Sequence, residues 1–174
     1  MGYGLMIKED YIESKLPEGV TLMVLDKDNI NWLWANINKY DSLFSDFAQR
    51  DFGGFLKRLC DKDTVCFKIS ENSKDVGYIY LEQIQIMRDC KFHGATFDRQ
   101  FKGKEEYAKA VIELAFDLFR LEKMSASVPD YARYAKSFLG RLGFKKEGRI
   151  RRGFKHKGEW YDVYLYGILK SEVT

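Results

Sequence analysis

The sequence has few cysteines and prolines and no long hydrophobic run, and each shortage excludes a class of protein. Its three cysteines, Cys60, Cys66 and Cys90, are an odd number without a CxxC pair, which argues against a disulfide framework and a structural zinc site. No segment approaches the roughly 20 apolar residues of a membrane helix, and the first residues lack the apolar core of a secretion signal. Two prolines and 45% hydrophobic residues exclude a disordered or collagen-like chain. We therefore expect a folded cytoplasmic protein with no metal site and no membrane partner.

Net charge is also small, because 29 Lys and Arg residues stand against 26 Asp and Glu residues in a chain of 174. This length predicts a single domain over residues 1–174. A net charge of +3 is too small to indicate a nucleic-acid-binding surface over the whole molecule, so any basic site must be local. Basic residues do gather near the C-terminus, where they could attract a phosphate group or an acidic protein tail, or form a solvated strand face. They are Lys145, Lys146, Arg149, Arg151, Arg152, Lys155 and Lys157, beside the single acid Glu147.

Hydrophobic periodicity predicts the element order βααβββαβαββ. Hairpins alternate with strand–helix–strand crossovers in this order, which indicates an α/β (α+β) fold with a mixed, mostly antiparallel sheet and helices on both faces. Asp130 is a plausible N-cap for the last helix, and hairpin loops are expected at 71–75 and 156–158. The expected strands are 20–25, 64–69, 76–85, 90–97, 124–128, 145–154 and 160–169, and the expected helices are 30–37, 47–59, 105–120 and 132–142.

A loop with the sequence FDRQFKGKE, residues 97–105, lies between a predicted strand and the most regular predicted helix. The first N–H groups of a helix have no partner within it, and the helix dipole favours negative charge there. Lys102 and Lys104 add full positive charges, so a phosphate or pyrophosphate is the expected ligand. The alternative is a solvated basic loop without a ligand.

Two segments of the chain resemble the GNAT acyltransferases. They are Gln100-Phe101-Lys102-Gly103-Lys104 and the closing run Leu142-Gly143-Phe144-Lys145-Lys146-Glu147-Gly148, which is followed by Gly158-Glu159-Trp160-Tyr161-Asp162. The closing run is most similar to the ribosomal-protein N-acetyltransferase (RimJ/RimL-like) branch. This resemblance implies a mixed sheet splayed at its middle and acetyl-CoA as the co-substrate.

The resemblance also implies where the co-substrate binds. Ala95 to Phe97, at the end of the preceding strand, would pair with the pantetheine arm, and main-chain N–H groups of the loop would bind the pyrophosphate. One residue departs from the family pattern: Glu105 replaces a glycine or alanine, so its carboxylate would repel the phosphates unless it turns outward. The loop residues concerned are Gln100, Phe101, Lys102, Gly103, Lys104 and Glu105.

The last helix departs from the family pattern as well. Ala132, Ala135 and Leu139 occupy the positions where the family often has asparagine, serine and a tyrosine that acts as general acid. Tyr134 or Tyr131 could supply a hydroxyl group from a shifted position, or these tyrosines could serve only in packing.

Acyl transfer to an amine also needs a group that removes a proton from the ammonium ion. Asp89 and His93 lie four residues apart on the strand before the loop, and therefore on the same face of that strand. Asp89 also corresponds, by its offset from the loop glycine, to a glutamate of the histone-acetylating branch. Glu82 on the neighbouring strand is a further candidate base. The alternative for His93 is a structural histidine with a satisfied hydrogen bond.

Two hypotheses about function follow. The first is an acetyl-CoA-dependent N-acetyltransferase that acts by direct attack of a primary amine, which could belong to a protein N-terminus, a lysine or a small molecule. The second is a GNAT fold without catalysis that serves as a binding or structural component of a larger assembly, as in some virion proteins. Neither hypothesis includes nucleic acid as an expected partner.

Overall fold

The computed structural model describes residues 16, 18–25, 30–40, 51–97 and 104–173. Its strands form a seven-stranded sheet in the order β1-β2-β3-β4-β5-β7-β6, and every neighbouring pair is antiparallel except β4 and β5. The element order is the predicted one. The strands are β1 (Val20–Val24), β2 (Val65–Glu71), β3 (Lys74–Gln85), β4 (Asp89–Thr96), β5 (Lys123–Pro129), β6 (Lys145–His156) and β7 (Glu159–Leu169), and the helices are α2 (Asn31–Ile37), α3 (Phe52–Leu59), α4 (Lys104–Phe119), α5 (Arg133–Arg141) and the 3₁₀ turn η3 (Lys170–Glu172).

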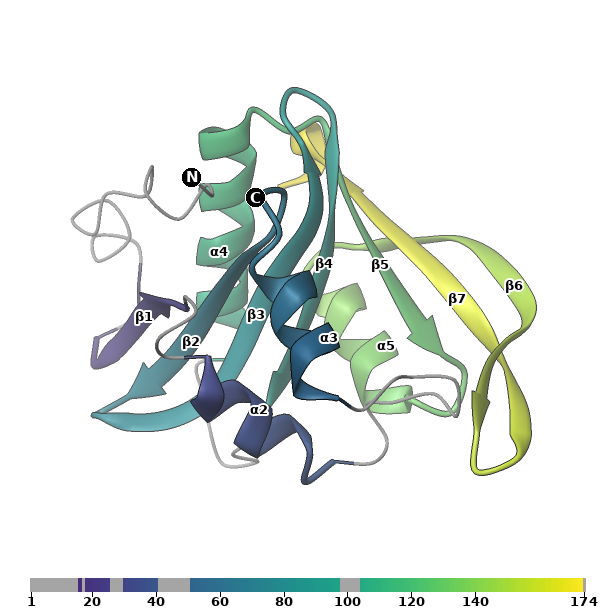
Figure 1. Cartoon of the computed structure of the whole chain (residues 1–174). Coiled ribbons are helices and arrows are strands. Elements are labelled where there is room, and N and C mark those ends of the chain that lie inside the picture. Colours follow the sequence, from purple (N-terminus) through teal and green to yellow (C-terminus); the bar gives the residue numbers. More distant parts are fainter. Residues whose placement is uncertain (1–15, 17, 26–29, 41–50, 98–103, 174) are drawn as a thin grey trace.

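Helices cover both faces of the sheet, as Figure 1 shows: α2 and α3 lie on one face, and α4 and α5 lie on the other. Each face has its own hydrophobic core. Phe55 and Leu59 of α3 pack with Tyr78 of β3 in one core, while the buried side of α4 packs with Leu139 of α5 in the other. The predicted fold class, a mixed and mostly antiparallel sheet between helices, is confirmed.

Helix α4 follows directly from its hydrophobic pattern. Ala108, Val111, Ile112, Ala115 and Phe119 recur at helical spacing, and each has 2% or less of its surface exposed. Burial of one Val, Ile or Phe side chain stabilises the fold by roughly 1.5–3 kcal/mol, so this face holds the helix firmly on the sheet. The start of α4, which matters for the site, is therefore fixed in place.

The hairpin turns are tighter than the sequence predicted. Strands β2 and β3 run through most of the expected loop at 71–75 and leave only Asn72 and Ser73 as the turn. Both residues have positive φ, at 49° and 65°, as a two-residue turn between twisted strands requires. Lys157 and Gly158 close the β6–β7 hairpin in the same way, with φ of 52° and 82°.

Two helix starts also differ from expectation. Asp51 is the N-cap of α3, where its Oδ1 accepts a hydrogen bond of 2.6 Å from the Gly54 N–H; the part of the predicted helix before residue 51 lies outside the described residues. Asp130 is not the N-cap of α5, because that helix begins at Arg133 and Asp130 instead pairs with Lys136 at 2.6 Å. Among the described helices, none is long and apolar enough to cross a membrane.

Candidate active site

The sheet opens between its two parallel strands. Strand β4 pairs with β5 only at Asp89–Lys91, opposite Lys123–Ser125, although both strands continue well beyond these residues. Beyond the paired segment, the facing edges of the strands have no neighbour to bond with, so their N–H and C=O groups are left without a strand partner. The predicted splay at the middle of the sheet is thus present, and a cavity of about 590 Å³ lies beside it.

The direction of the backbone groups along β4 decides which of them face the opening. Phe97 N–H donates a hydrogen bond of 2.7 Å to the Val76 carbonyl of the β3 side. Backbone groups alternate in direction along an antiparallel strand, so Ala95 also bonds toward β3, while Gly94 and Thr96 turn toward the gap. Of the predicted pantetheine contacts, the Phe97 N–H is therefore already used, and Ala95 borders the cavity with its side chain.

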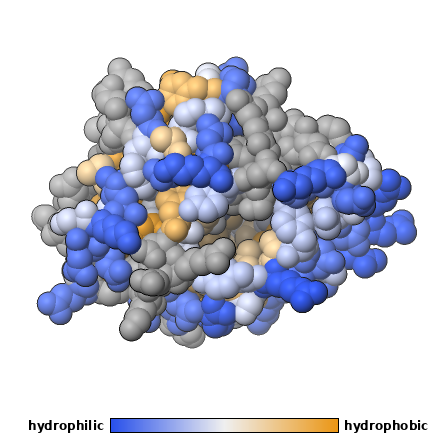
Figure 2. Space-filling view, turned by 90° about the horizontal axis from the view of Figure 1, so that it is seen from below, coloured by the Kyte–Doolittle hydropathy of each residue, from blue (hydrophilic) through white to orange (hydrophobic). Residues whose placement is uncertain are grey.

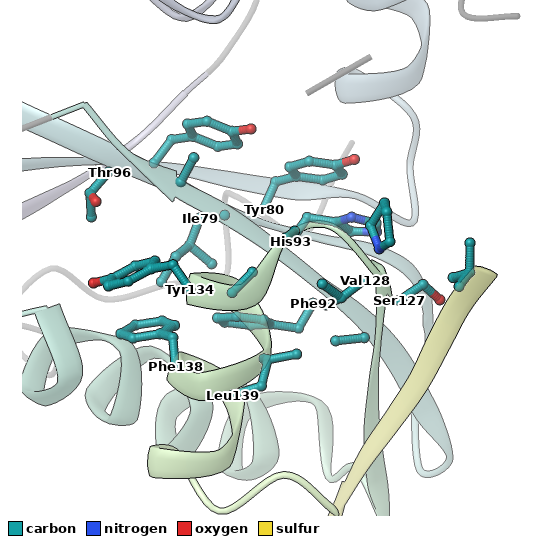
Figure 3. A pocket seen from close by; sticks show the side chains of 18 of the residues that line it. Ile79, Tyr80, Phe92, His93, Thr96, Ser127, Val128, Tyr134, Phe138 and Leu139 are labelled. Carbon is teal, nitrogen blue, oxygen red and sulfur yellow. The ribbon is translucent and has the colours of Figure 1, made fainter. Parts of the chain in front are cut away.

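The cavity has one wall of strands and one wall of helices, and both are mainly aromatic or apolar. In Figure 3, His93 and Tyr80 lie on the strand side, and Tyr134, Phe138 and Leu139 project from α5. The strand-side lining residues are Tyr78, Ile79, Tyr80, Phe92, His93, Gly94, Ala95, Thr96, Ala126, Ser127, Val128, Pro129, Phe154 and Val163, and the helix-side residues are Tyr107, Tyr131, Ala132, Tyr134, Ala135, Phe138 and Leu139.

His93 is held in place by two neighbours on β3. Its Nε2 lies 2.9 Å from Oε1 of Glu82, and its ring stacks on Tyr80 with 4.5 Å between ring centroids and 6° between planes. The ionised carboxylate can only accept, so Nε2 must carry the proton and Nδ1 of the neutral ring is left as an acceptor. This hydrogen bond is the main reason that the pKa of Glu82 is lowered, against the opposing effect of burial. The arrangement is that of an imidazole oriented by a carboxylate.

Asp89, the other predicted base, lies elsewhere. It is on the same face of β4 as His93, but four residues of strand span about 13 Å. It belongs to the closed, paired end of β4, its nearest described ionic partner is Arg88 at 3.9 Å, and it is not among the residues that line the cavity. The structure therefore brings Glu82, and not Asp89, to His93.

Both candidate tyrosines reach the cavity from the helix side. Tyr134 is 58% exposed and its ring is nearly parallel to that of Phe138, 6.2 Å away. Tyr131 lies before α5 and contacts His156 and Tyr161. Tyr134 is thus the more open of the two hydroxyl-bearing side chains.

The three departures from the family pattern on the last helix also face the cavity. Ala132, Ala135 and Leu139 all line it, so the positions at which the family often carries polar groups are apolar at the site itself. A further lining residue, Tyr107 of α4, was missed in the sequence; it is buried, and burial raises the pKa of its hydroxyl. The only feature of the sequence that could have indicated this residue is its position, three residues after the start of the helix that follows the predicted phosphate loop.

Of the predicted phosphate loop, Gln100, Phe101, Lys102 and Gly103 lie outside the described residues. Helix α4 begins at Lys104, so its first N–H groups stand where the sequence placed the anion site. The Glu105 carboxylate forms an ion pair with Arg141 of α5, with 2.5 Å between Glu105 Oε1 and Arg141 Nε. Tyr107, in the first turn of the same helix, lines the cavity, so this helix start lies near it.

The basic residues at 145–157 lie on the β6–β7 hairpin, and Figure 2 shows strongly hydrophilic side chains gathered over that side of the molecule. Several of these charges are engaged by aromatic rings of the same hairpin. Arg152 and Lys155 lie 5.4 and 5.7 Å from the ring centroid of Trp160, and Lys146 lies 3.6 Å from that of Tyr164. These rings orient the basic side chains but leave their positive charge in place. Elsewhere in the part of the chain that the structure describes, no group of three or more His, Cys, Asp or Glu is arranged to hold a metal ion.

The chain is similar to known acetyltransferases in both sequence and fold. It is 24% identical to the uncharacterized N-acetyltransferase p20 of Bacillus licheniformis over 92% of this chain and 98% of that protein, and 29% identical to the probable N-acetyltransferase YjcK of Bacillus subtilis over 68% of each. The fold matches a spermidine N-acetyltransferase from Vibrio cholerae, solved in complex with CoA and spermine, with a TM-score of 0.77 and 18% identity over 90% of this chain and 99% of that one.

The family model for the acetyltransferase (GNAT) domain matches residues 27–165, which include the whole cavity and the start of α4. This supports the enzyme hypothesis over a GNAT fold without catalysis. The chain belongs to the GNAT family of acetyltransferases, N-acetyltransferases that take acetyl-CoA as their acetyl donor.

Proposed function

We propose that this protein acetylates a primary amine by direct attack, with His93 as the general base. The observation that carries the proposal is the Glu82–His93 contact at the border of the cavity, where the carboxylate fixes Nε2 and leaves Nδ1 to accept a proton. A neutral imidazole is the side chain best suited to take a proton from an ammonium ion near neutral pH. Glu82 acts on the reaction through His93, which makes it a positioning residue.

The acetyl donor fits along the open edge of β4. Acetyl-CoA supplies the acetyl group as a thioester, which an amine attacks without a covalent enzyme intermediate. The backbone groups of Gly94 and Thr96 are those that face the gap, and Ala95 and Phe92 add apolar surface beside them. One N–H of this edge is also the donor available to a carbonyl oxygen that gains negative charge. The first N–H groups of α4, from Lys104 and Glu105, would hold the pyrophosphate.

Tyr134 is the proposed general acid. Its hydroxyl belongs to an exposed side chain on the helix wall of the cavity, opposite the strand wall that carries His93 (Figure 3). Leu139, at the position where the family often has this tyrosine, carries no hydroxyl. We therefore assign the role to Tyr134, which precedes Leu139 by five residues on α5.

The acceptor amine is proposed only as a class. His93 and Tyr80 project from the sheet face that carries α2 and α3, so we expect the amine to approach from that face. A test panel should include spermidine, because a protein with this fold is a spermidine N-acetyltransferase. It should also include protein N-termini, because the closing segment resembles the ribosomal-protein N-acetyltransferase branch.

The test is a transfer assay in which free CoA is measured as it is released from acetyl-CoA. The panel contains spermidine, short peptides with free N-termini, a lysine derivative and simple alkylamines. Turnover of at least one amine, lost in His93→Ala, supports the proposal. No turnover with any amine by a protein that binds CoA, or full activity of His93→Ala, would contradict it.

A further inference from the structure

The ion pair between Glu105 and Arg141 joins the start of α4 to the last turn of α5 at the side of the cavity. Arg141 Nε lies 2.5 Å from Glu105 Oε1, and Nη1 of the same guanidinium donates to Ser137 Oγ at 2.7 Å. The guanidinium also lies 5.9 Å from the Tyr134 ring centroid and 5.8 Å from that of Phe138. Arg141 is thus held by the Glu105 carboxylate, by the Ser137 hydroxyl and by contacts with Tyr134 and Phe138.

This pair is too exposed to serve mainly in folding. The two side chains retain 42% and 41% of their accessible surface, and ion pairs of that exposure contribute little to stability. The position of the pair at the start of α4 instead affects how that helix start can bind an anion. Glu105 is among the first residues of α4, so an unpaired carboxylate there would place a negative charge beside N–H groups that favour an anion.

We infer that Arg141 holds the Glu105 carboxylate away from the phosphates of acetyl-CoA and so allows a helix that begins with Lys-Glu-Glu to bind them. Arg141 is then a positioning residue of the cofactor site. This inference rests on the proposed placement of the pyrophosphate at α4. It explains how the chain carries a glutamate where the family has a glycine or alanine.

The clearest test is a double-mutant cycle read by calorimetry with CoA alone, without acceptor or turnover. Arg141→Gln keeps a polar side chain but removes the guanidinium charge, and it should weaken CoA binding about tenfold because Glu105 is left unpaired beside the phosphates. Glu105→Gln should bind CoA as well as the wild type or better. The double variant should return to within about threefold of the wild type, because the repelling charge is gone.

Each other outcome overturns the inference. A double variant as weak as Arg141→Gln would show that the guanidinium binds the phosphates itself. An Arg141→Gln protein that binds CoA normally would show that the pair has no effect on the site. Arg133→Gln is the matched control, a second exposed arginine on α5, and equal weakening there would indicate a general charge effect. Wild-type protein that fails to bind CoA at all would contradict the proposed function, which keeps the two failures distinct.

Two additional measurements support the cycle. Thermal unfolding of each variant should stay close to that of the wild type, since the pair is exposed. The defect of Arg141→Gln should shrink as salt is raised, because repulsion between exposed charges is screened over about 8 Å at physiological ionic strength. A defect that stays constant with salt would contradict an electrostatic cause.

Discussion

The two walls of the cavity carry different kinds of chemistry. The strand wall holds His93 in a polar contact with Glu82 and against the ring of Tyr80, while the helix wall presents Ala132, Ala135, Leu139 and the exposed Tyr134. The polar groups that the family often places on this helix are missing. The difference supports the proposal that the proton-accepting group lies on a strand, where the β3–β4 pairing holds it, and that the helix mainly shapes the cavity.

The largest loss of activity should follow a substitution on the strand wall. His93→Ala removes the proposed base, and kcat/KM for the amine should fall at least about 100-fold. Binding of CoA should be unchanged, because Nδ1 of His93 is assigned to the amine. The matched control is His156→Ala, the other histidine, whose ring stacks on Tyr131. An equal fall in kcat/KM for the two variants would contradict the assignment of the base to His93.

A smaller loss is expected for Glu82→Gln, which keeps a hydrogen-bond acceptor but not the negative charge. We expect kcat to fall about tenfold while the KM for the amine stays the same, because the ring loses orientation without losing contact with substrate. Glu82→Asp should recover part of the activity. A rise in the KM with kcat unchanged, or no recovery in Glu82→Asp, would contradict a positioning role for Glu82.

A substitution on the helix wall should lower the activity less than the substitutions on the strand wall. Tyr134→Phe removes only a hydroxyl, and kcat should fall about three- to tenfold. Tyr131→Phe is the comparison, because its ring is packed among Phe154, His156 and Tyr161. If Tyr131→Phe gives the greater loss, the acid lies on the loop before α5 and the assignment to Tyr134 is wrong.

The smallest effect concerns stability and its dependence on pH. Because the folded-state pKa of Glu82 is lowered from 4.5, its ionised form favours the folded protein. The stabilisation should be complete above about pH 4.5 and should be lost as pH falls through the lower folded-state pKa. At pH 7 the free energy of unfolding of Glu82→Gln should be lower than that of the wild type by about 1 kcal/mol or less, since the pair is partly exposed. Urea unfolding at pH 7 and pH 3 measures this difference, and an equal difference at both values would contradict it.

The order of elements could be predicted because each one carries a local signal. The buried face of α4 repeats at helical spacing, and the strands are bounded by turns. The turn at Asn72-Ser73 was predicted too long, because polar residues at the end of a strand resemble loop residues when the facing strand is unknown. Helix α5 starts later than predicted, because Asp130 pairs with Lys136 and does not cap.

The site could be predicted only in part, since its contacts join distant residues. His93 stood out as one of two histidines, but its contact with Glu82 depends on the β3–β4 register, which is irregular between Glu82 and Gln85. Strand periodicity correctly placed Asp89 on the face of His93, yet periodicity gives no distance from the cavity. The partner of Glu105 lies 36 residues away on another helix, so no local pattern could reveal it.

The short ladder between β4 and β5 has a mechanical consequence. The ladder between the four-stranded part of the sheet, β1 to β4, and the three-stranded part formed by β5, β7 and β6 has three residue pairs. Each part has long antiparallel ladders of its own, so bending should concentrate at the junction. Hydrogen bonding within the sheet is thus weakest at this junction, and the core against α4, which includes Phe92 of β4 and Met124 of β5, holds the two parts together across it.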